Sequence, residues 1–303
     1  MITGPAEPHE QTGRRRRRLS ADQVRSKMLQ AAHDIVVENG MSLSLEELSL
    51  EDVMRRASVA RSSVYRIWPY KDDFMEDLLC HMAGPDWYGT ANFNQESMDL
   101  AASIVRANTD RLGSIEGRSE VVREAVRQAV AANFDSIVSS ADWQIYLAIV
   151  TTARTTRDAQ LRAKIATALN ASETRFTSSM ADFYQQIAAA LGIRMRRGYR
   201  FEHLTLAGSS ILEGLAYRAI IGDLIKDDRL ESAGNRSWEL HRLIYDTLPG
   251  PALDGTDAPW SFAASAYLGI LEGLTEMDPD FIAPAEASQS SEGPAPIVDE
   301  PDP

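Results

Sequence analysis

The feature that most constrains this chain is a long stretch without proline. No proline occurs between residues 86 and 248, and apolar residues recur there with helical spacing while no strand-like alternation persists. Because proline interrupts helices and alternation marks strands, this pattern predicts an all-α protein. The expected helices of this part span residues 95–112, 119–139, 141–156, 158–191, 201–225, 235–247 and 259–275.

The N-terminal part predicts four shorter helices, and their boundaries carry capping or breaking residues. Ser20 and Gln23 have the spacing of a capping box, in which each side chain accepts a hydrogen bond from the other residue's backbone amide. Ser49 is the expected cap of the second helix, and Pro69 ends the third because the residue before proline avoids helical angles. The expected helices cover residues 21–39, 50–56, 61–68 and 71–83.

Charge is distributed unevenly along the 303 residues. The net charge is −13, yet residues 53–71 hold five basic groups and no acid, which gives a local surface compatible with DNA. Residues 1–19 contain five consecutive arginines, and residues 276–303 hold eight acids and no base. Such segments offer little to bury, so the sequence predicts a disordered basic arm and a disordered acidic tail.

Several classes of protein are disfavoured by what the sequence lacks. The single cysteine, Cys80, excludes an internal disulfide and any cysteine-based zinc or iron–sulfur site. The five histidines show no helical metal-binding spacing, and no nucleotide-binding or nucleophile motif occurs. No uninterrupted apolar run is long enough to span a bilayer, and the N-terminus has no secretory signal. We therefore expect a cytoplasmic protein with no cofactor, no metal and no membrane partner, and not an enzyme.

The strongest functional signal is the segment at residues 49–71, SLEDVMRRASVARSSVYRIWPYK. It predicts two short helices joined by a tight turn, and the second helix is rich in arginine and serine. This is the layout of a helix-turn-helix, whose second helix enters the major groove of DNA. The expected apolar seam between the helices consists of Val53, Ala57, Val59 and Val64.

The same segment resembles the DNA-binding unit of the TetR (tetracycline-repressor-type) transcriptional regulators. The resemblance rests on residues 64–71, VYRIWPYK, followed by Asp72, Asp73 and Phe74, and it covers residues 21–83. A weaker likeness lies at residues 211–220, ILEGLAYRAI, which is similar to a helix that these regulators use in dimerisation. Two departures stand out: Ser58 replaces the turn glycine, and Ala60 replaces the usual Ser or Thr cap.

The resemblance implies an architecture and a set of partners. It implies a DNA-binding domain at residues 20–83 and a helical ligand-binding and dimerisation domain at residues 84–275. The expected partners are double-stranded operator DNA with a pseudo-palindromic sequence, a second copy of the chain bound through the helices at 201–225 and 235–247, and a small-molecule effector. In such a regulator the effector favours a conformation that leaves the operator. Repression is favoured over activation, since no separate activating segment is visible.

The expected DNA-contacting residues fall into three groups. The resemblance assigns backbone phosphates to Ser49, Tyr65 and Lys71. Residues on the base-reading face are Arg61, Ser62, Ser63 and Arg66, and arginine can bond guanine bidentately while serine adapts to either edge. The arm offers Arg14, Arg15, Arg16, Arg17 and Arg18. These could enter a minor groove or provide unspecific attraction to phosphates, and the sequence leaves both alternatives open.

Aromatic residues on the predicted helices of the second domain are candidates for a ligand pocket. They are Trp143, Tyr146, Phe176, Phe183 and Tyr184. Apolar walls with a few polar tips suit a small-molecule site, but an ordinary hydrophobic core is the competing interpretation. Arg154 could pair with an anionic ligand, although exposure to solvent is the simpler expectation. The alternative function is a helical enzyme or small-molecule-binding protein with a vestigial helix-turn-helix. A catalytic constellation would favour it, and the sequence shows none.

Overall fold

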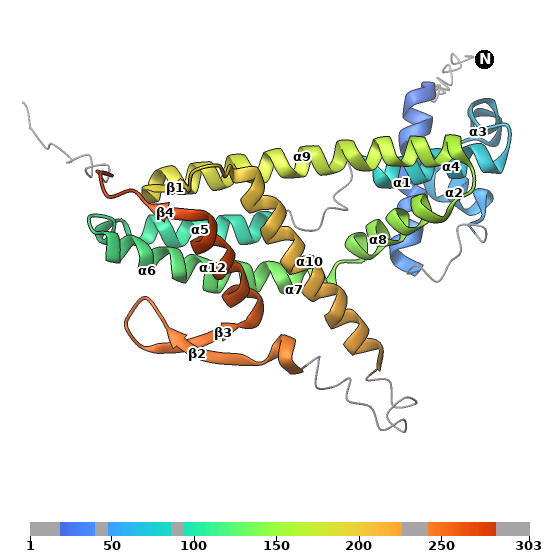
Figure 1. The fold of residues 1–303 in the computed structure, drawn as a ribbon. Coiled ribbons are helices and arrows are strands. Elements are labelled where there is room, and N and C mark those ends of the chain that lie inside the picture. Colours follow the sequence, from blue (N-terminus) through green and yellow to red (C-terminus); the bar gives the residue numbers. More distant parts are fainter. Residues whose placement is uncertain (1–18, 40–47, 86–93, 226–241, 283–303) are drawn as a thin grey trace, which may run out of the picture.

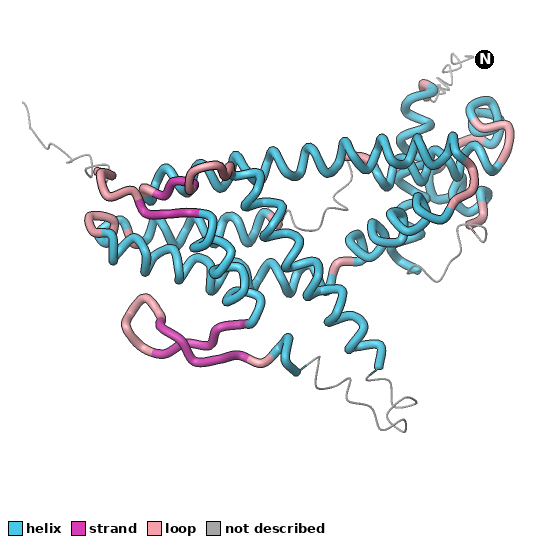
Figure 2. The backbone as a smooth tube through the Cα atoms, in the orientation of Figure 1, coloured by secondary structure: helices cyan, strands magenta, loops and turns pink. Residues whose placement is uncertain are grey.

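The structure, a computed structural model, describes residues 19–39, 48–85, 94–225 and 242–282, and this part of the chain is mostly helical (Figures 1 and 2). The four N-terminal helices confirm the sequence expectation to within one residue at each described end. The expected connection at residues 41–48 and the arm at residues 1–18 lie largely outside the described residues. The four helices are α1 (Ala21–Asn39), α2 (Leu50–Ala57), α3 (Arg61–Ile67) and α4 (Lys71–Ala83).

The larger C-terminal part is a second group of helices (Figure 1). A π-helical turn, η3 (Val126–Val130), interrupts what the sequence predicted as one helix over residues 119–139. The longest helix, α9, runs along one side of the molecule and reaches from this part to the N-terminal helices (Figure 1). The remaining helices are α5 (Gln95–Ala107), η2 (Thr109–Arg111), α6 (Ile115–Ala125), α7 (Ala131–Ser139), α8 (Ala141–Thr155), α9 (Ala159–Leu191), α10 (Phe201–Ile225) and α12 (Phe262–Leu274).

The described helices confirm the all-α expectation, and two short antiparallel strand pairs that the sequence did not indicate are added to it. Strand β1 (Ile193–Met195) pairs with β4 (Thr275–Met277), and β2 (Thr247–Pro251) pairs with β3 (Asp257–Ser261). The expected helix at 235–247 is therefore wrong at its end, where β2 begins, while residues 226–241 lie outside the described chain. The helix expected from residue 259 starts at 262 instead, because the Ser261 side chain accepts the Ala264 amide and caps it there.

The beginning of the expected disordered tail is also structured. Residues 276–277 belong to β4, and the Asp278 amide donates to the Gly192 carbonyl. The Phe281 ring lies 4.9 Å from the buried Arg118 guanidinium, which also donates to the Asp278 carbonyl. The acidic composition of this segment did not indicate that it packs against the rest of the chain. The contacts that hold it are made by the Phe281 ring and by the backbone of Asp278. The rest of the tail, from residue 283, lies outside the described residues.

The buried side chains form two hydrophobic cores. The first core joins α1 to α4 with Ile145 and Ile149 of α8 and Ile165 of α9. The second core joins α5 to α7 with α10, α12 and the end of α9 at Leu191. Helix α9 thus contributes to both cores, and α8 does the same because its Trp143 belongs to the second. The two helices therefore connect the N-terminal unit to the rest of the molecule through both cores.

Helix α10 is the only described helix that is long and apolar enough, by length and composition, to cross a membrane. The core helix of a soluble protein passes the same test. Leu212, Leu215 and Ala216 of α10 are buried in the second core, so part of its apolar surface is explained by packing within the chain.

Candidate nucleic-acid interface and apolar cavity

The α2–turn–α3 unit has the geometry of a helix-turn-helix. The Ser49 hydroxyl accepts the Asp52 amide and caps α2, as its sequence position predicted. Ser58 ends α2 in the left-handed region at φ 54° and ψ 42°, a conformation that glycine adopts at lower cost. Ala60 precedes α3 without any side-chain cap. The expected seam is confirmed, since Val53, Ala57, Val59 and Val64 are all buried.

The outer face of α3 carries the side chains that the sequence assigned to base reading. Arg61, Ser62 and Arg66 are exposed, whereas Ser63 is half-buried. The Arg61 guanidinium lies 5.3 Å from the centre of the Tyr65 ring, which is itself exposed. Within the described chain, Arg66 makes no ion pair. The Arg66 guanidinium can therefore reach a base edge without first breaking an ion pair within the described chain.

The local basic surface is more balanced by acids than the sequence run suggested. Arg61 Nη1 lies 3.1 Å from Glu51 Oε1, and Arg55 pairs with Asp52. Arg56 Nη2 lies 2.5 Å from Glu38 Oε1 on α1, and this bond holds the pKa of the Glu38 carboxyl below its ordinary value. These acids stand outside residues 53–71, so counting charges in that window could not reveal them.

The start of α4 fixes α3 against the rest of the N-terminal unit. The Trp68 ring is buried and meets the Phe74 ring edge-on at 5.0 Å between centroids. The Trp68 indole N–H donates to Asp77 Oδ2 at 2.7 Å, and Arg25 of α1 pairs with the same carboxylate. Next to this anchor, Lys71 is exposed at the first position of α4.

Tyr70, which sequence reasoning did not assign to the interface, is 73% exposed beside Lys71. An aromatic residue between Pro69 and Lys71 was the available signal. The arginines of the arm, Arg14 to Arg18, lie outside the described residues.

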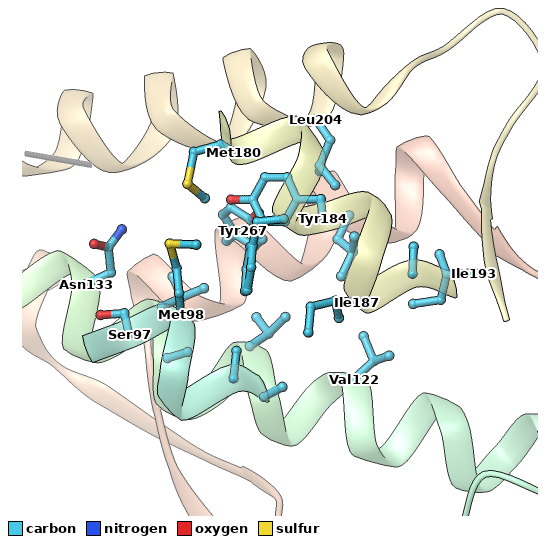
Figure 3. A pocket seen from close by; sticks show the side chains of 18 of the residues that line it. Ser97, Met98, Val122, Asn133, Met180, Tyr184, Ile187, Ile193, Leu204 and Tyr267 are labelled. Carbon is cyan, nitrogen blue, oxygen red and sulfur yellow. The ribbon is translucent and has the colours of Figure 1, made fainter. Parts of the chain in front are cut away.

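A cavity of about 130 Å³ lies in the second part of the molecule (Figure 3). Its walls come from α5, α6, η3, α7, α9, α10 and α12. Of the five aromatic residues that the sequence assigned to a pocket, Phe183 and Tyr184 line it. Trp143, Tyr146 and Phe176 do not, so that part of the assignment needs correction.

Each of these three side chains is buried elsewhere. Trp143 is packed in the second core away from the cavity walls. The Tyr146 hydroxyl donates to Glu173, and burial together with this bond raises the pKa of Tyr146 above its ordinary value. Phe176 lies two helical turns before Phe183 on α9, and the cavity begins only at Met180 on this helix. Arg154, the candidate for an anionic ligand, is exposed.

The cavity is apolar but contains two buried polar atoms without a partner. Ser97 Oγ and Asn133 Oδ1 are buried and, within the described chain, form no hydrogen bond. The Tyr184 and Tyr267 hydroxyls bond each other, and burial raises the pKa of both groups. Sequence reasoning missed Ser97, Asn133 and Tyr267. The available signal for Asn133 was an amide within an otherwise apolar helical stretch.

The described residues offer little for other chemistry. In the ranges that the structure describes, no three His, Cys, Asp or Glu side chains gather as metal ligands would. Cys80 on α4 is half-buried against the first core, and burial raises the pKa of its thiol. A raised pKa leaves less thiolate at neutral pH, so this thiol is a weak nucleophile.

No known protein-family model matches the chain, and no curated protein is similar to it in sequence. Several solved structures are similar in fold. One is a putative TetR-family transcriptional regulator from Mesorhizobium loti, with 14% identity, a TM-score of 0.43, and coverage of 84% of this chain and 98% of that one. Another is a TetR-family transcriptional regulator from Cytophaga hutchinsonii, with 12% identity, a TM-score of 0.38, and coverage of 86% and 100%.

A third is NalD, the secondary repressor of the MexAB-OprM multidrug efflux pump in Pseudomonas aeruginosa. It has 18% identity and a TM-score of 0.30, with coverage of 73% of this chain and 94% of NalD. The chain is similar to these regulators. Because the identities and TM-scores are low, the function proposed below rests on the geometry of the helix-turn-helix.

Proposed function

We propose that this chain is a DNA-binding transcriptional regulator, most simply a repressor, that acts in the cytoplasm on a pseudo-palindromic operator. The observation that carries the proposal is the α2–turn–α3 unit, whose inner face is buried in the first core while Arg61, Ser62 and Arg66 stay exposed. Exposed arginine and serine on the second helix of such a unit match the requirements of base reading in the major groove. Ser49, Tyr65 and Lys71 flank them and suit contacts to phosphates.

Two copies of the chain are proposed to bind together, because one short recognition helix reads few bases. Helix α10 leaves Leu206, Tyr217 and Ile221 exposed, and their spacing places them on one stripe of the helix. An exposed apolar stripe of this kind supports a contact with a second copy. Leu215 and Ala216 are buried in the protomer's own core, so substitutions there would damage the fold instead of testing this contact.

The proposed response to a ligand uses the helices that belong to both cores. Helix α9 is tied to α4 by the Lys164–Glu76 pair at 2.7 Å and reaches the cavity through Met180 and Tyr184. Helix α8 approaches α1, with His33 Nε2 lying 3.4 Å from Asp142 Oδ1. A ligand that favours one arrangement of these helices would change the position of α3 relative to α3 of the second chain. The two recognition helices would then no longer fit the operator together, and the dimer would release it.

The second candidate function is a small-molecule-binding protein or enzyme in which the helix-turn-helix no longer binds DNA. The cavity favours ligand binding, and it does not by itself require DNA. The two functions differ in one property, which is the selection of particular DNA sequences.

The test is selection of binding sequences from a random pool of duplex DNA with the purified full chain. We expect enrichment of inverted repeats with half-sites about one helical turn apart. The double variant Leu206→Glu/Tyr217→Glu should be monomeric by light scattering and should lose the preference for two half-sites. The matched control Gln186→Glu lies on the exposed surface of α9 and should leave both properties unchanged. If the unmodified chain enriches no sequence, the second candidate function replaces the first.

A further inference from the structure

The cavity has a polar end and an apolar end (Figure 3). Ser97 and Asn133 lie toward one end, and Val122, Ile187 and Ile193 lie toward the other. Met98, Met180, Tyr184 and Tyr267 are placed between them (Figure 3). Methionine side chains are flexible and adapt to the shape of a bound molecule. The π-helical turn η3 also borders the cavity, and such turns are frequent at functional sites.

The polar groups of the cavity can be sorted by whether their hydrogen bonds are already made. Asn94 Oδ1 accepts the Glu96 and Ser97 amides at the start of α5. The Thr275 hydroxyl donates to the Leu271 carbonyl at 2.7 Å, and the two tyrosine hydroxyls bond each other. Among the described residues that line the cavity, two buried side-chain atoms are left without a hydrogen-bond partner, Ser97 Oγ and Asn133 Oδ1.

Some helical hydroxyls of the described chain bond to a carbonyl of their own helix, whereas Ser97 lies in the first turn of α5 and makes no such bond. Ser103 on the same helix donates to the Leu100 carbonyl, and Thr151 and Thr167 donate to carbonyls one turn earlier. Ser97 is 6% exposed and does not make such a bond. Leaving a buried polar group without a partner is unfavourable, so a ligand that supplies the partner recovers free energy on binding.

The lining also restricts the charge of a ligand. Among the described residues, no Asp, Glu, Lys, Arg or His side chain lines the cavity. A carboxylate or an ammonium group would therefore lose its hydration without gaining an opposite charge, which is strongly unfavourable. A hydroxyl group can supply a hydrogen-bond partner to both atoms, because it can accept from the Ser97 O–H and donate to Asn133 Oδ1.

We propose that this cavity binds a small neutral molecule with an apolar body and one hydroxyl group. The hydroxyl bonds Ser97 and Asn133, and the body lies against Met98, Met180 and the aromatic rings. The volume of about 130 Å³ is similar to that of an engineered cavity of about 150 Å³ that holds benzene, so a substituted single ring is a suitable size. That such a molecule also releases DNA rests on the proposed function, whereas its binding to the cavity does not.

The test compares, by calorimetry with the full chain at pH 7, three probes that share a methyl-substituted benzene ring and differ in one substituent. They are 4-methylphenol, 1,4-dimethylbenzene and 4-methylbenzoate, which carry a hydroxyl, a methyl and a carboxylate at the same position. We expect 4-methylphenol to bind at least about tenfold more tightly than either of the others. Equal binding of 1,4-dimethylbenzene, tighter binding of 4-methylbenzoate, or no binding of 4-methylphenol would overturn the proposal.

The variant Ser97→Ala/Asn133→Leu should abolish the advantage of 4-methylphenol and retain binding of 1,4-dimethylbenzene. Ser103→Ala is the matched control on α5, and it should leave the ranking unchanged because the Ser103 hydroxyl bonds only its own helix. If the double variant fails to fold, the ranking of the three probes on the unmodified chain still tests whether the cavity prefers a neutral hydroxyl compound.

A parallel measurement separates this inference from the proposed function. Operator affinity is measured with and without saturating 4-methylphenol. Weaker operator binding supports both ideas. Cavity binding with unchanged operator affinity supports the ligand class and contradicts ligand-induced release. A chain that selects no DNA contradicts the regulator proposal and leaves the ranking of the probes intact as evidence about the cavity.

Discussion

The two cores of this protein use the same apolar residue types but are filled differently. In the first core Met28, Val53, Val64 and Leu78 have no exposed surface, and these side chains fix α3 in place. The second core borders the cavity, where two buried polar atoms have no described partner. Fully buried side chains such as Val121 and Ile137 also occur in the second core, so the difference lies in the cavity, and unfilled space suits a unit that admits a ligand.

The comparison also shows that the cores are not independent. Helix α9 contributes Ile165 to the first core and Leu191 to the second, so one continuous helix belongs to both cores. The sequence predicted a domain boundary between residues 83 and 84. This boundary does not separate the two cores, because residues of α8 and α9, which follow it, belong to the first core. The connection between them depends on α8 and α9, which follow that boundary by many residues.

The largest expected effect comes from removing a large buried side chain from the first core. Phe74→Ala removes a buried ring that packs against Trp68, and we expect a loss of about 3–5 kcal/mol in the free energy of unfolding. Because α8 and α9 join the cores, denaturation followed by circular dichroism and by tryptophan fluorescence should show one shared transition.

The matched control for this variant is Phe262→Ala. The Phe262 ring is 48% exposed, so its removal should change stability far less. Two separate transitions, with the second core unaffected by Phe74→Ala, would show that the cores fold independently and would break the proposed connection.

A smaller effect is expected from a charged contact beside the second core. The Glu124 carboxylate accepts bonds from the Arg127 guanidinium at 2.6 and 2.9 Å, and these lower the pKa of Glu124 below its ordinary value of 4.5. We expect Glu124→Gln to cost about 1–3 kcal/mol at pH 7.

The pH dependence of this cost follows from the sign of the shift. A carboxyl whose pKa is lowered by folding stabilises the protein above its unfolded pKa, and this contribution disappears as the pH falls through the lowered value. The difference between Glu124→Gln and the unmodified chain in urea denaturation should therefore be complete at pH 7 and shrink below pH 4.5. A difference that stays constant from pH 7 to pH 3 would contradict the assignment.

The smallest effect concerns the turn of the helix-turn-helix. Ser58→Gly should stabilise the protein by about 1 kcal/mol, because glycine adopts the left-handed conformation without steric cost. Ser62→Gly within α3 is the opposite control and should destabilise by about 0.5–1 kcal/mol. The two midpoints of thermal unfolding should move in opposite directions, and a loss of stability from Ser58→Gly would contradict the described turn.

The sequence predicted the first region far better than the second. Caps such as Ser49, a breaker such as Pro69 and the seam of small apolar residues are local signals, and each acts within a few residues. The cavity walls come from helices far apart in sequence, so helical periodicity alone could not show which faces meet. This is why only Phe183 and Tyr184 of the five predicted aromatic residues line the cavity, whereas Trp143, Tyr146 and Phe176 do not.

The strand pairs and the ion pairs were missed for a related reason. Strand β1 pairs with β4, which is far away in sequence, and neither segment is long enough to show alternation. Glu38 pairs with Arg56 only because α1 and α2 pack together. The balance of charge around α3 therefore depends on tertiary structure, which a window of residues 53–71 does not contain.

The measurement that tests the central claim most directly is the affinity of α3 variants for the selected operator and for random DNA across a salt series. The account predicts that Arg66→Ala costs about 1–3 kcal/mol on the operator and much less on random DNA. Lys71→Ala and deletion of residues 1–18 should weaken both DNAs alike, and each lost phosphate contact should reduce the salt slope by about 0.9. If Arg66→Ala and Arg61→Ala keep full discrimination while the arm deletion abolishes it, α3 is not the element that reads the sequence.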